Sequence, residues 1–372
     1  MFGQGLSSDV ADLKQHLPST APSDKAQMSA VTAENKPTER SAWHDNVRFV
    51  AICLVVAGHW GIGRRWMPEF DAISNQMVYS FHMALFVILA GRFSKPGGSL
   101  STVFRQGWGQ LLVPLGLFIT FDSLLMHRLT GAPSVISTRA FPYGLWFLAS
   151  LFCWRLLVLP LGRWRTVDVL AGPLAVVLLA ASGLVPNVFS LIRTLAFFPA
   201  FLFGMAVLPR IEPTLRRPMV RCFAAMWVVA GLLLVAYQSD RNLKPWMLQA
   251  SRYADMGSDQ FRGAAIRIGL MVFGMVMAVG IMALVSARNL GVVSRLGRYT
   301  LYAYLLHLPV TRVLRFWLFP NTKDQPLVAV AVTLAIIPFT MVAMSAPVRR
   351  LTQPMVEPIE FVRPRPSPSR TR

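Results

Sequence analysis

The stretch VRFVAICLVVAGHW, from Val47 to Trp60, decides the fold class, because it is almost entirely apolar and opens an expected membrane span over 47–63. Arg48 lies near one end of this stretch and His59 near the other. Eleven residues are about three helical turns, so the two side chains face the same way, roughly 16 Å apart. The pattern predicts a polar track along one wall of a membrane helix.

The composition also indicates a membrane protein. Of the 372 residues, 54% are hydrophobic and only 15% are charged, whereas soluble domains are typically about a quarter charged. The formal charge is +20, but the arginines alternate with apolar runs and form no single basic stripe, so we expect no nucleic-acid partner. Three scattered cysteines, Cys53, Cys153 and Cys222, lie inside apolar segments and are expected to be small buried residues.

A membrane span needs roughly 20 mostly apolar residues, and ten segments of the chain approach this length. The sequence therefore predicts an all-α polytopic membrane protein with about ten transmembrane helices. The expected spans are 47–63, 72–93, 111–126, 144–162, 167–185, 189–209, 219–237, 264–285, 299–319 and 326–346.

The ends of the chain differ in composition from this apolar region. We expect a disordered polar N-terminal tail over 1–46 with no cleavable signal peptide, a transmembrane domain over 47–346, and a basic, proline-rich C-terminal tail over 347–372. With both termini in the cytoplasm, the inner segments hold about twice as many Lys and Arg as the outer ones, which favours this orientation. The exception is the outer loop 238–263, which carries four basic residues.

Two further histidines lie inside expected spans. His82 and His307 are both predicted near mid-depth, where ionisable groups are costly and normally face a cavity or a partner. Such a histidine also serves in many proteins as a hydrogen bond between helices, and this alternative stays open for His307. The spacing of the histidines shows no metal-ligand pattern, so we expect no bound metal.

Charged residues in other spans have simpler alternatives. Asp122 in the third span could pair with Arg155 in the fourth. Arg312 and Arg315 lie toward the outer end of the ninth span and could extend to the interface. Together with the histidines, these residues predict a polar interior.

Five stretches of the chain together resemble the membrane-bound acyltransferase-3 family, in particular its fucose 4-O-acetylase-like branch. The likeness covers residues 44 to 346, and includes an Arg and a His at the spacing of Arg48 and His59. The stretches are DNVRFVAICLVVAGHW (45–60), VYSFHMALFVILAGRFSKP (78–96), YGLWFLASLF (143–152), RTLAFFPAFLFGM (193–205) and LGRYTLYAYLLH (296–307).

Two positions depart from the family pattern. Ala84 replaces the usual proline of the second span, and before the third span Arg105 stands alone where the family commonly has a basic pair. The second departure affects the basic residues that, by this resemblance, would bind the phosphates of the acyl donor.

The resemblance implies transfer of an acyl group, most often acetyl, from cytoplasmic acyl-CoA to a hydroxyl of a sugar, polysaccharide, glycolipid or glycosylated metabolite of the cell envelope. The donor is a substrate, and no permanently bound cofactor is expected. Arg48, with Arg105, would hold the phosphates of coenzyme A at the cytoplasmic face of the inner membrane. His59 would be the general base, since imidazole titrates near neutral pH.

Three further residues complete the predicted site. His82 would orient His59, stabilise the oxyanion or carry the acyl group, and these alternatives remain open. Trp146 and His307 are predicted to bind the acceptor, and Trp60 could also stack on a sugar ring, although both tryptophans are typical of interfacial anchors as well. Two other functions fit the pattern: a polytopic transporter and a non-catalytic relative of the acyltransferases.

Overall fold

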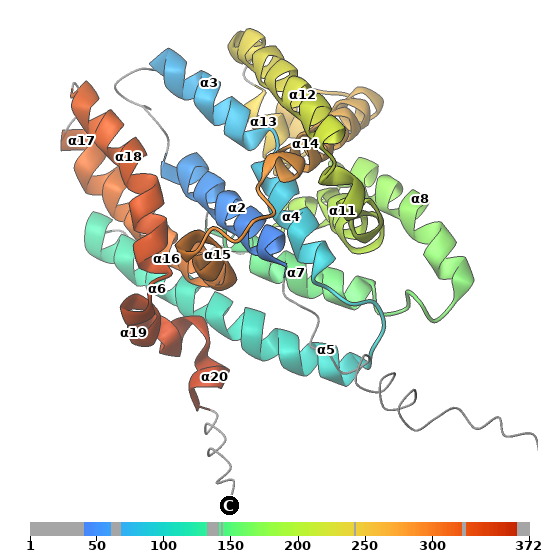
Figure 1. Ribbon diagram of the computed structural model, residues 1–372, viewed down its shortest axis with the longest axis horizontal. Helices are drawn as coiled ribbons and strands as arrows, with labels where there is room; N and C mark the ends of the chain where they lie inside the picture. Colours follow the sequence, from blue (N-terminus) through green and yellow to red (C-terminus); the bar gives the residue numbers. More distant parts are fainter. Residues whose placement is uncertain are drawn as a thin grey trace, which may run out of the picture. The chain divides into compact units, whose positions relative to one another are not determined.

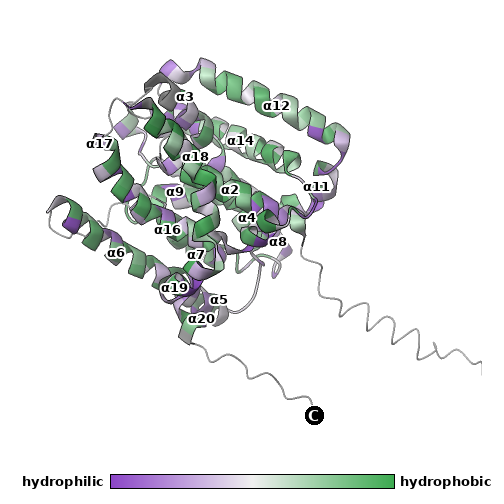
Figure 2. Cartoon of the chain, turned by 60° about the vertical axis from the view of Figure 1, so that its left-hand side comes forward, coloured by the Kyte–Doolittle hydropathy of each residue, from purple (hydrophilic) through white to green (hydrophobic). Residues whose placement is uncertain are grey.

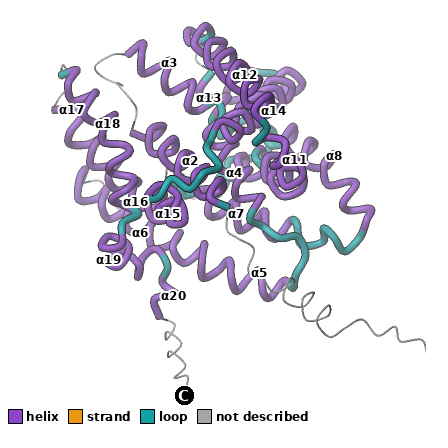
Figure 3. Tube along the Cα trace, viewed as in Figure 1, coloured by secondary structure: helices purple, strands orange, loops and turns teal. Residues whose placement is uncertain are grey.

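The computed structural model describes residues 41–60, 68–131, 141–142, 144–241, 243–321 and 325–362, and within these ranges every regular element is a helix (Figures 1 and 3). The expected all-α class is confirmed for this part of the chain. Residues 1–41 and 42–372 form separate units, and the predicted disordered tail lies outside the described residues up to position 40.

Helix α2 (Ala42–Trp60) lies at the centre of the described helices and carries both Arg48 and His59 (Figure 1). It packs against α4 (His82–Arg92), α15 (Val292–Leu296), α16 (Thr300–Val313) and α18 (Pro326–Ala343). Most of its side chains are buried, because its apolar residues occupy every face and neighbouring helices surround it. The helix therefore holds its polar residues inside the bundle.

The second expected span is a broken helix. Two residues separate the end of α3 (Pro68–Tyr79) from the start of α4, and the two helices together include an apolar segment, Ile73–Arg92, long enough to cross a membrane. At the break, the Ser80 hydroxyl donates to the carbonyl of Met77 at 2.7 Å. A side-chain hydroxyl that bonds to a nearby backbone carbonyl competes with the helical ladder, which agrees with an interruption at this residue.

The third expected span is longer than predicted. Helix α5 (Leu100–Gly107), a π-helical turn η2 (Trp108–Leu112) and α6 (Val113–Thr130) run on as one helix of 31 residues. The Ser99 hydroxyl caps its start by accepting from the backbone N–H of Thr102 at 3.2 Å. Gly131, with φ of 67°, ends it, since this left-handed conformation favours glycine.

The remaining elements follow in chain order. They are α7 (Trp146–Leu157), α8 (Arg165–Ala181), α9 (Leu191–Ala196), α10 (Phe198–Leu202), η3 (Phe203–Val207), α11 (Leu208–Leu215), α12 (Pro218–Tyr237), η4 (Ser239–Arg241), α13 (Lys244–Met247), η5 (Ala254–Met256), α14 (Gln260–Leu284), η6 (Gly297–Tyr299), η7 (Leu314–Leu318), α17 (Phe319–Asn321), α19 (Ala346–Val356) and α20 (Pro358–Val362).

Helix is present at each of the ten expected segments, but the described helices differ in length. Four of them are long and apolar enough to cross a membrane, or five if the bent pair α18 and α19 counts as one span. The others are short or interrupted: the sixth expected span, for example, consists of α9, α10, η3 and α11 in succession. The structure thus supports four to five apolar spans directly.

Helix α12 presents the clearest lipid-facing surface. It is apolar along nearly its whole length (Figure 2), yet only Val228, Gly231 and Val235 are buried, where it packs on α14 and α3. Phe223, Trp227 and other large apolar side chains remain exposed. A contiguous exposed apolar surface of this kind is typical of contact with a membrane.

The C-terminal region folds back on the helices. Helix α19 bends by 74° from α18, and helices α19 and α20 lie almost entirely within the predicted basic tail. The Tyr302 hydroxyl donates to a carboxylate oxygen of Glu357 at 2.7 Å, and the Arg349 guanidinium lies 3.4 Å from the centre of the Tyr299 ring. These contacts hold the segment against η6 and α16.

Asp122 of α6 pairs with Arg312 of α16. Both ends of the guanidinium donate to the carboxylate, at 2.7 Å each, and both side chains are largely buried. The alternative pairing of Asp122 with Arg155 is therefore wrong, as is extension of Arg312 to the interface. A bidentate pair compensates the burial of both charges and fixes the orientation of α6 against α16.

Candidate functional site

A cavity of about 210 Å³ lies at the C-terminal end of α2, and His59 forms part of its wall. The lining comes from the ends of α2, α3, α4 and α7, from α9 and η7, and from the segment that follows α12. The lining residues are His59, Tyr79, His82, Met83, Trp146, Arg193, Lys244, Met247, Leu248 and Arg315.

His59 and His307 are in direct contact. The Nδ1 atom of His59 lies 2.6 Å from Nε2 of His307, and the two rings are nearly parallel. The Nδ1 atom of His307 lies 3.2 Å from the carbonyl oxygen of Ala303. A carbonyl only accepts hydrogen bonds, so this nitrogen carries the proton and Nε2 of His307 accepts from His59. The hydrogen bonds thus assign Nδ1–H to His59 and leave its lone pair on Nε2.

Close packing holds the His59 ring in this position. A Cβ atom added at Gly144 would lie 3.2 Å from Cε1 of His59, tighter than side chains normally pack. The Tyr304 hydroxyl donates to the Gly144 carbonyl, which ties this glycine to α16 beside His307. A side chain at Gly144, two residues before α7, would therefore press against the imidazole.

His82 lies on the same cavity with a different set of contacts. As the first residue of α4, it donates from Nδ1 to the Val78 carbonyl at 2.8 Å, across the break in the helix. Its Nε2 atom is fully buried and has no hydrogen-bond partner among the described residues. Because Nδ1 carries the proton, Nε2 is an acceptor. His307, and not His82, is the imidazole that contacts His59.

Three cationic side chains from separate elements line the cavity. Arg193 of α9 donates to the Leu248 carbonyl at 3.2 Å and lies over the Trp146 ring at 5.4 Å. Arg315 of η7 donates to the His59 carbonyl at 2.6 Å. Lys244 of α13 lies over the Tyr79 ring at 4.8 Å. Among the described lining residues none is acidic.

The segment after α12 folds over this end of α2. The Gln76 side chain donates to the Ser239 carbonyl at 2.8 Å and accepts from the backbone N–H of Leu243 at 3.3 Å. Arg267 of α14 donates to Ser251 at 2.6 Å from the other side. These hydrogen bonds place Lys244 and Leu248 on the cavity wall.

At the opposite end of α2, Arg48 belongs to a second polar group. It donates to Asp45 at 3.3 Å, and its guanidinium lies 3.7 Å from the centre of the Phe93 ring. Asp45 also accepts from Arg298 at 3.2 Å. Arg48 is half-buried, and stacking on Phe93 keeps its cationic head at this end of the helix.

Glu212 of α11 stabilises the same end. Its carboxylate bonds to His44 at 2.9 Å and to Arg92 at 2.5 Å. Burial alone would raise the pKa of the Glu212 carboxyl, but these two partners outweigh burial and hold the pKa below its ordinary value. Glu212 therefore stays ionised and neutralises part of the positive charge beside Arg48.

The face of α2 between Arg48 and His59 is apolar. Ile52 and Val55 lie on this face at helical spacing from both residues, and both are buried in the main apolar core. The polar residues are thus grouped at the two ends of the helix, with apolar packing between them. Arg105 is exposed near the end of α5, and no contact in the described residues joins it to Arg48.

The two candidate tryptophans have different surroundings. Trp146 is almost fully buried under the cavity, where it stacks on Phe197 with ring centres 5.4 Å apart. Trp60 packs against Phe339 in a separate apolar cluster. Trp146 therefore reaches the cavity that contains His59, whereas Trp60 is not among the residues that line it.

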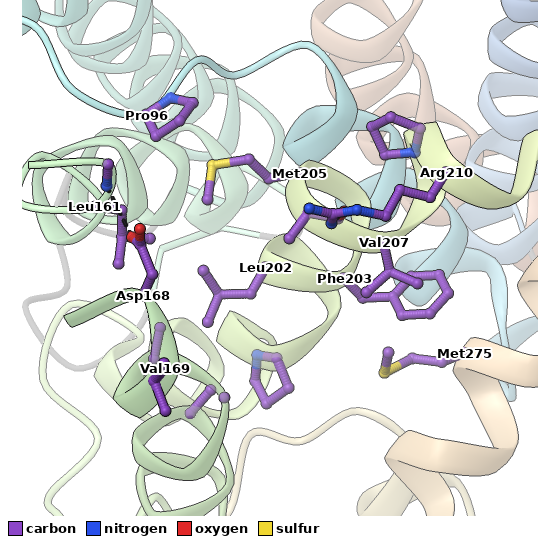
Figure 4. A pocket seen from close by; sticks show the side chains of 17 residues that line it. Pro96, Leu161, Asp168, Val169, Leu202, Phe203, Met205, Val207, Arg210 and Met275 are labelled. Atoms are coloured by element: carbon purple, nitrogen blue, oxygen red, sulfur yellow. Dashed lines mark hydrogen bonds between the residues drawn. The ribbon is translucent and has the colours of Figure 1, made fainter. Parts of the chain in front are cut away.

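A larger cavity, of about 890 Å³, lies elsewhere, between α8, α10, η3, α11 and α14 (Figure 4). Leu202, Phe203 and Met275 give it an apolar wall, and Asp168 and Arg210 are its charged lining residues. Asp168 accepts from the backbone N–H of Gly162 at 2.8 Å. None of the predicted site residues lines this cavity, so it is a less suitable reaction site.

Sequence reasoning missed Arg193 and Lys244 as site residues, and for Arg315 it left extension to the interface open as an alternative to a place in the polar interior. One observation pointed to Lys244: the loop 238–263 carries four basic residues on the side where the charge rule expects few. The structure offers a local reason for this exception, because the loop folds over the cavity and Lys244 lines it. No local pattern distinguished Arg193 or Arg315 from other arginines near span ends.

A family model described as an acyltransferase domain matches residues 41–345, which is most of the chain. The chain belongs to this acyltransferase-3 family, whose match together with the apolar helices indicates a membrane acyltransferase. No curated protein and no solved structure matches the chain.

Proposed function

We propose that this protein is a membrane-bound O-acyltransferase of the fucose 4-O-acetylase-like branch, located in the inner membrane. It transfers an acyl group, most often acetyl, from cytoplasmic acyl-CoA to a hydroxyl of a cell-envelope carbohydrate or glycosylated acceptor. The observation that supports this function most is the contact between His59 and His307 on the wall of a cavity. It provides an imidazole with a defined lone pair where an acceptor can bind.

In the proposed reaction, His59 acts as the general base. Its Nε2 atom takes the proton of the acceptor hydroxyl while that oxygen attacks the thioester carbonyl. The tetrahedral intermediate then collapses, the carbon–sulfur bond breaks, and the coenzyme A sulfur leaves with the proton that His59 returns. The hydrogen bond to His307 keeps the proton of His59 on Nδ1 throughout.

His82 and Trp146 support this chemistry from the cavity wall. The unpartnered Nε2 atom of His82 is an acceptor in the tautomer that its bond to Val78 selects, so it suits contact with an acceptor hydroxyl. An oxyanion needs a donor, which His82 provides at this atom only when it is protonated. Trp146 contributes an aromatic surface on which a sugar ring can lie.

The donor would approach from the other end of α2. Arg48 there is half-buried and stacked on Phe93, with Arg92 near the same ring, and a cationic group of this kind suits the phosphates of coenzyme A. Arg105 would contribute from the exposed surface of α5. The pantetheine arm must then pass between α2 and its neighbours at Ile52 and Val55 to bring the thioester to His59.

An assay of ester formation tests the proposed function. Membranes that contain the protein, supplied with labelled acetyl-CoA and a panel of glycans, should produce label bound to glycan and released by mild alkali. Matched membranes without the protein are the control. Movement of labelled glycan across the membrane without ester would support a transporter, and absence of both activities would support a non-catalytic role.

Arg48→Ala should raise the apparent KM for acetyl-CoA by about tenfold or more, because it removes a charge-assisted contact to phosphate. The KM for the acceptor should stay unchanged. Arg298→Ala is the matched control, since it removes the other arginine bonded to Asp45. Equal effects of the two variants on the donor KM would show that Arg48 acts only by stabilising Asp45.

His307→Phe should lower kcat by at least about tenfold with little change in either KM, because the phenyl ring keeps the packing but no longer fixes the tautomer of His59. His307→Gln should restore part of the activity, since its amide oxygen accepts a hydrogen bond. His127→Phe, at an exposed position of α6, serves as the control. A change confined to the acceptor KM would instead indicate that His307 binds the acceptor.

A further inference from the structure

We infer that the acceptor is an anion: a hydroxyl compound that carries a phosphate, carboxylate or sulfate group within a few ångströms of the hydroxyl to be acylated. This inference rests on the proposed function and adds the substrate class. It depends on the charge of the cavity wall beside His59, which comes from residues that the sequence patterns did not assign to the site.

The wall of this cavity is cationic. Arg193, Lys244 and Arg315 all line a space of about 210 Å³, and no aspartate or glutamate is among its described lining residues. A cavity whose walls carry one sign of charge attracts ligands of the opposite sign. The charge of the described lining residues therefore favours a ligand with negative charge.

Arg193 makes the strongest contribution to this argument. Its Nε atom donates to the Leu248 carbonyl at 3.2 Å, and its guanidinium lies over the Trp146 ring. The described residues provide it with no carboxylate partner, although the side chain is half-buried. These two contacts leave its terminal NH₂ groups available for a planar oxyanion, the geometry for which guanidinium is suited.

The cations are held in position by separate parts of the fold. Arg315 is fixed by its 2.6 Å bond to the His59 carbonyl. Lys244 is anchored by the contacts of Gln76 with the neighbouring backbone. A site whose charges come from α9, α13 and η7 and converge beside a reactive imidazole is preorganised for recognition of an oxyanion.

The size of the cavity limits the ligand. Cavities that bind drug-sized molecules have volumes of about 300–1,000 Å³, so a space of about 210 Å³ accepts one charged sugar residue or a group of similar size. The acylated unit of a larger acceptor would enter alone. The Trp146 ring then suits contact with the sugar ring, and the cations suit contact with its charged group.

A binding experiment tests this without requiring turnover. Inorganic phosphate should raise the melting temperature of the purified protein in detergent, at constant ionic strength set with chloride, and methyl glucoside should not. Arg193→Gln and Lys244→Gln should each weaken phosphate binding by about ten- to a hundredfold, the loss of one charge-assisted hydrogen bond. Arg155→Gln, at a half-buried arginine of α7 outside the cavity, should bind phosphate normally, and so should His59→Ala.

A kinetic comparison distinguishes the acceptor classes. With labelled acetyl-CoA, glucose 6-phosphate or glucuronate should be acylated in preference to methyl glucoside, and the first two separate phosphate from carboxylate recognition. Arg193→Gln should raise the KM for the charged acceptor and leave that for acetyl-CoA unchanged.

Three results would overturn the inference. One is equal acylation of neutral and charged sugars, with no change in the acceptor KM of Arg193→Gln. This result would leave the proposed function intact. Another is a thermal shift by coenzyme A alone that requires Arg193 and Lys244, which would assign these cations to the donor. The third is absence of phosphate binding by the wild type. Failure of all ester formation with phosphate binding retained would instead refute the proposed function.

Discussion

His59→Ala should reduce the rate of ester formation by about 10²- to 10⁴-fold, the usual contribution of a positioned general base. Of the two histidines among the described residues that line the cavity, His59 is the one in contact with a second imidazole, His307, which holds the proton on Nδ1 while Nε2 takes the proton of the acceptor. The measurement is the initial rate of alkali-labile label transfer from acetyl-CoA to glycan, at saturating donor and acceptor. His59→Gln, which preserves size and polarity, should be equally impaired, because an amide is not a base.

Two controls make this result informative. The amount of each variant in the membrane and its melting temperature in detergent should match the wild type, since the loss concerns chemistry and not folding. His127→Ala removes an exposed histidine of α6 and should keep full activity. Ester formation that survives in His59→Ala would disprove the base assignment, and His82, which also lines the cavity, would then be the next residue to test.

Asp122→Asn should destabilise the protein by about 3–5 kcal/mol, the usual effect of removing one partner from a buried ion pair. The variant leaves Arg312 without the carboxylate that accepts both of its 2.7 Å hydrogen bonds, in a region where charge is costly. The measurement is the melting temperature in detergent, together with the yield of membrane-inserted protein.

A double variant separates charge compensation from packing. Asp122→Asn combined with Arg312→Gln should recover a substantial part of the lost stability, because no uncompensated charge is then left behind. Asp255→Asn is the matched control: it breaks the Arg252–Asp255 pair in an exposed loop and should leave the melting temperature unchanged. If Asp122→Asn behaved like Asp255→Asn, the pair would not contribute to the packing of α6 against α16.

The residues of the candidate site illustrate how far sequence reasoning reached. The 11-residue spacing of Arg48 and His59 correctly placed both on one face of one helix, since helical periodicity is a local property. The same reasoning predicted a continuous polar track, whereas the structure has buried Ile52 and Val55 between the two polar ends. These residues were visible in the sequence, but their burial depends on which helices pack against them.

Pairing between distant residues was the main point on which the sequence was insufficient. Asp122 had several arginines as potential partners, and only the packing of α6 against α16 selected Arg312 over Arg155. In the same way, His307 was an isolated histidine in the ninth expected span until the crossing of α16 and α2 placed it 2.6 Å from His59.

The sequence by itself determined that this chain is helical, apolar and related to the membrane acyltransferases, because composition, helical period and local motifs are properties of neighbouring residues. Only the tertiary structure decided which polar groups meet. Helix crossings and the folding of the 238–263 loop bring Arg193, Lys244 and Arg315 to the cavity of His59 from positions far apart in the chain. No local pattern records such contacts, since they arise from the packing of whole helices.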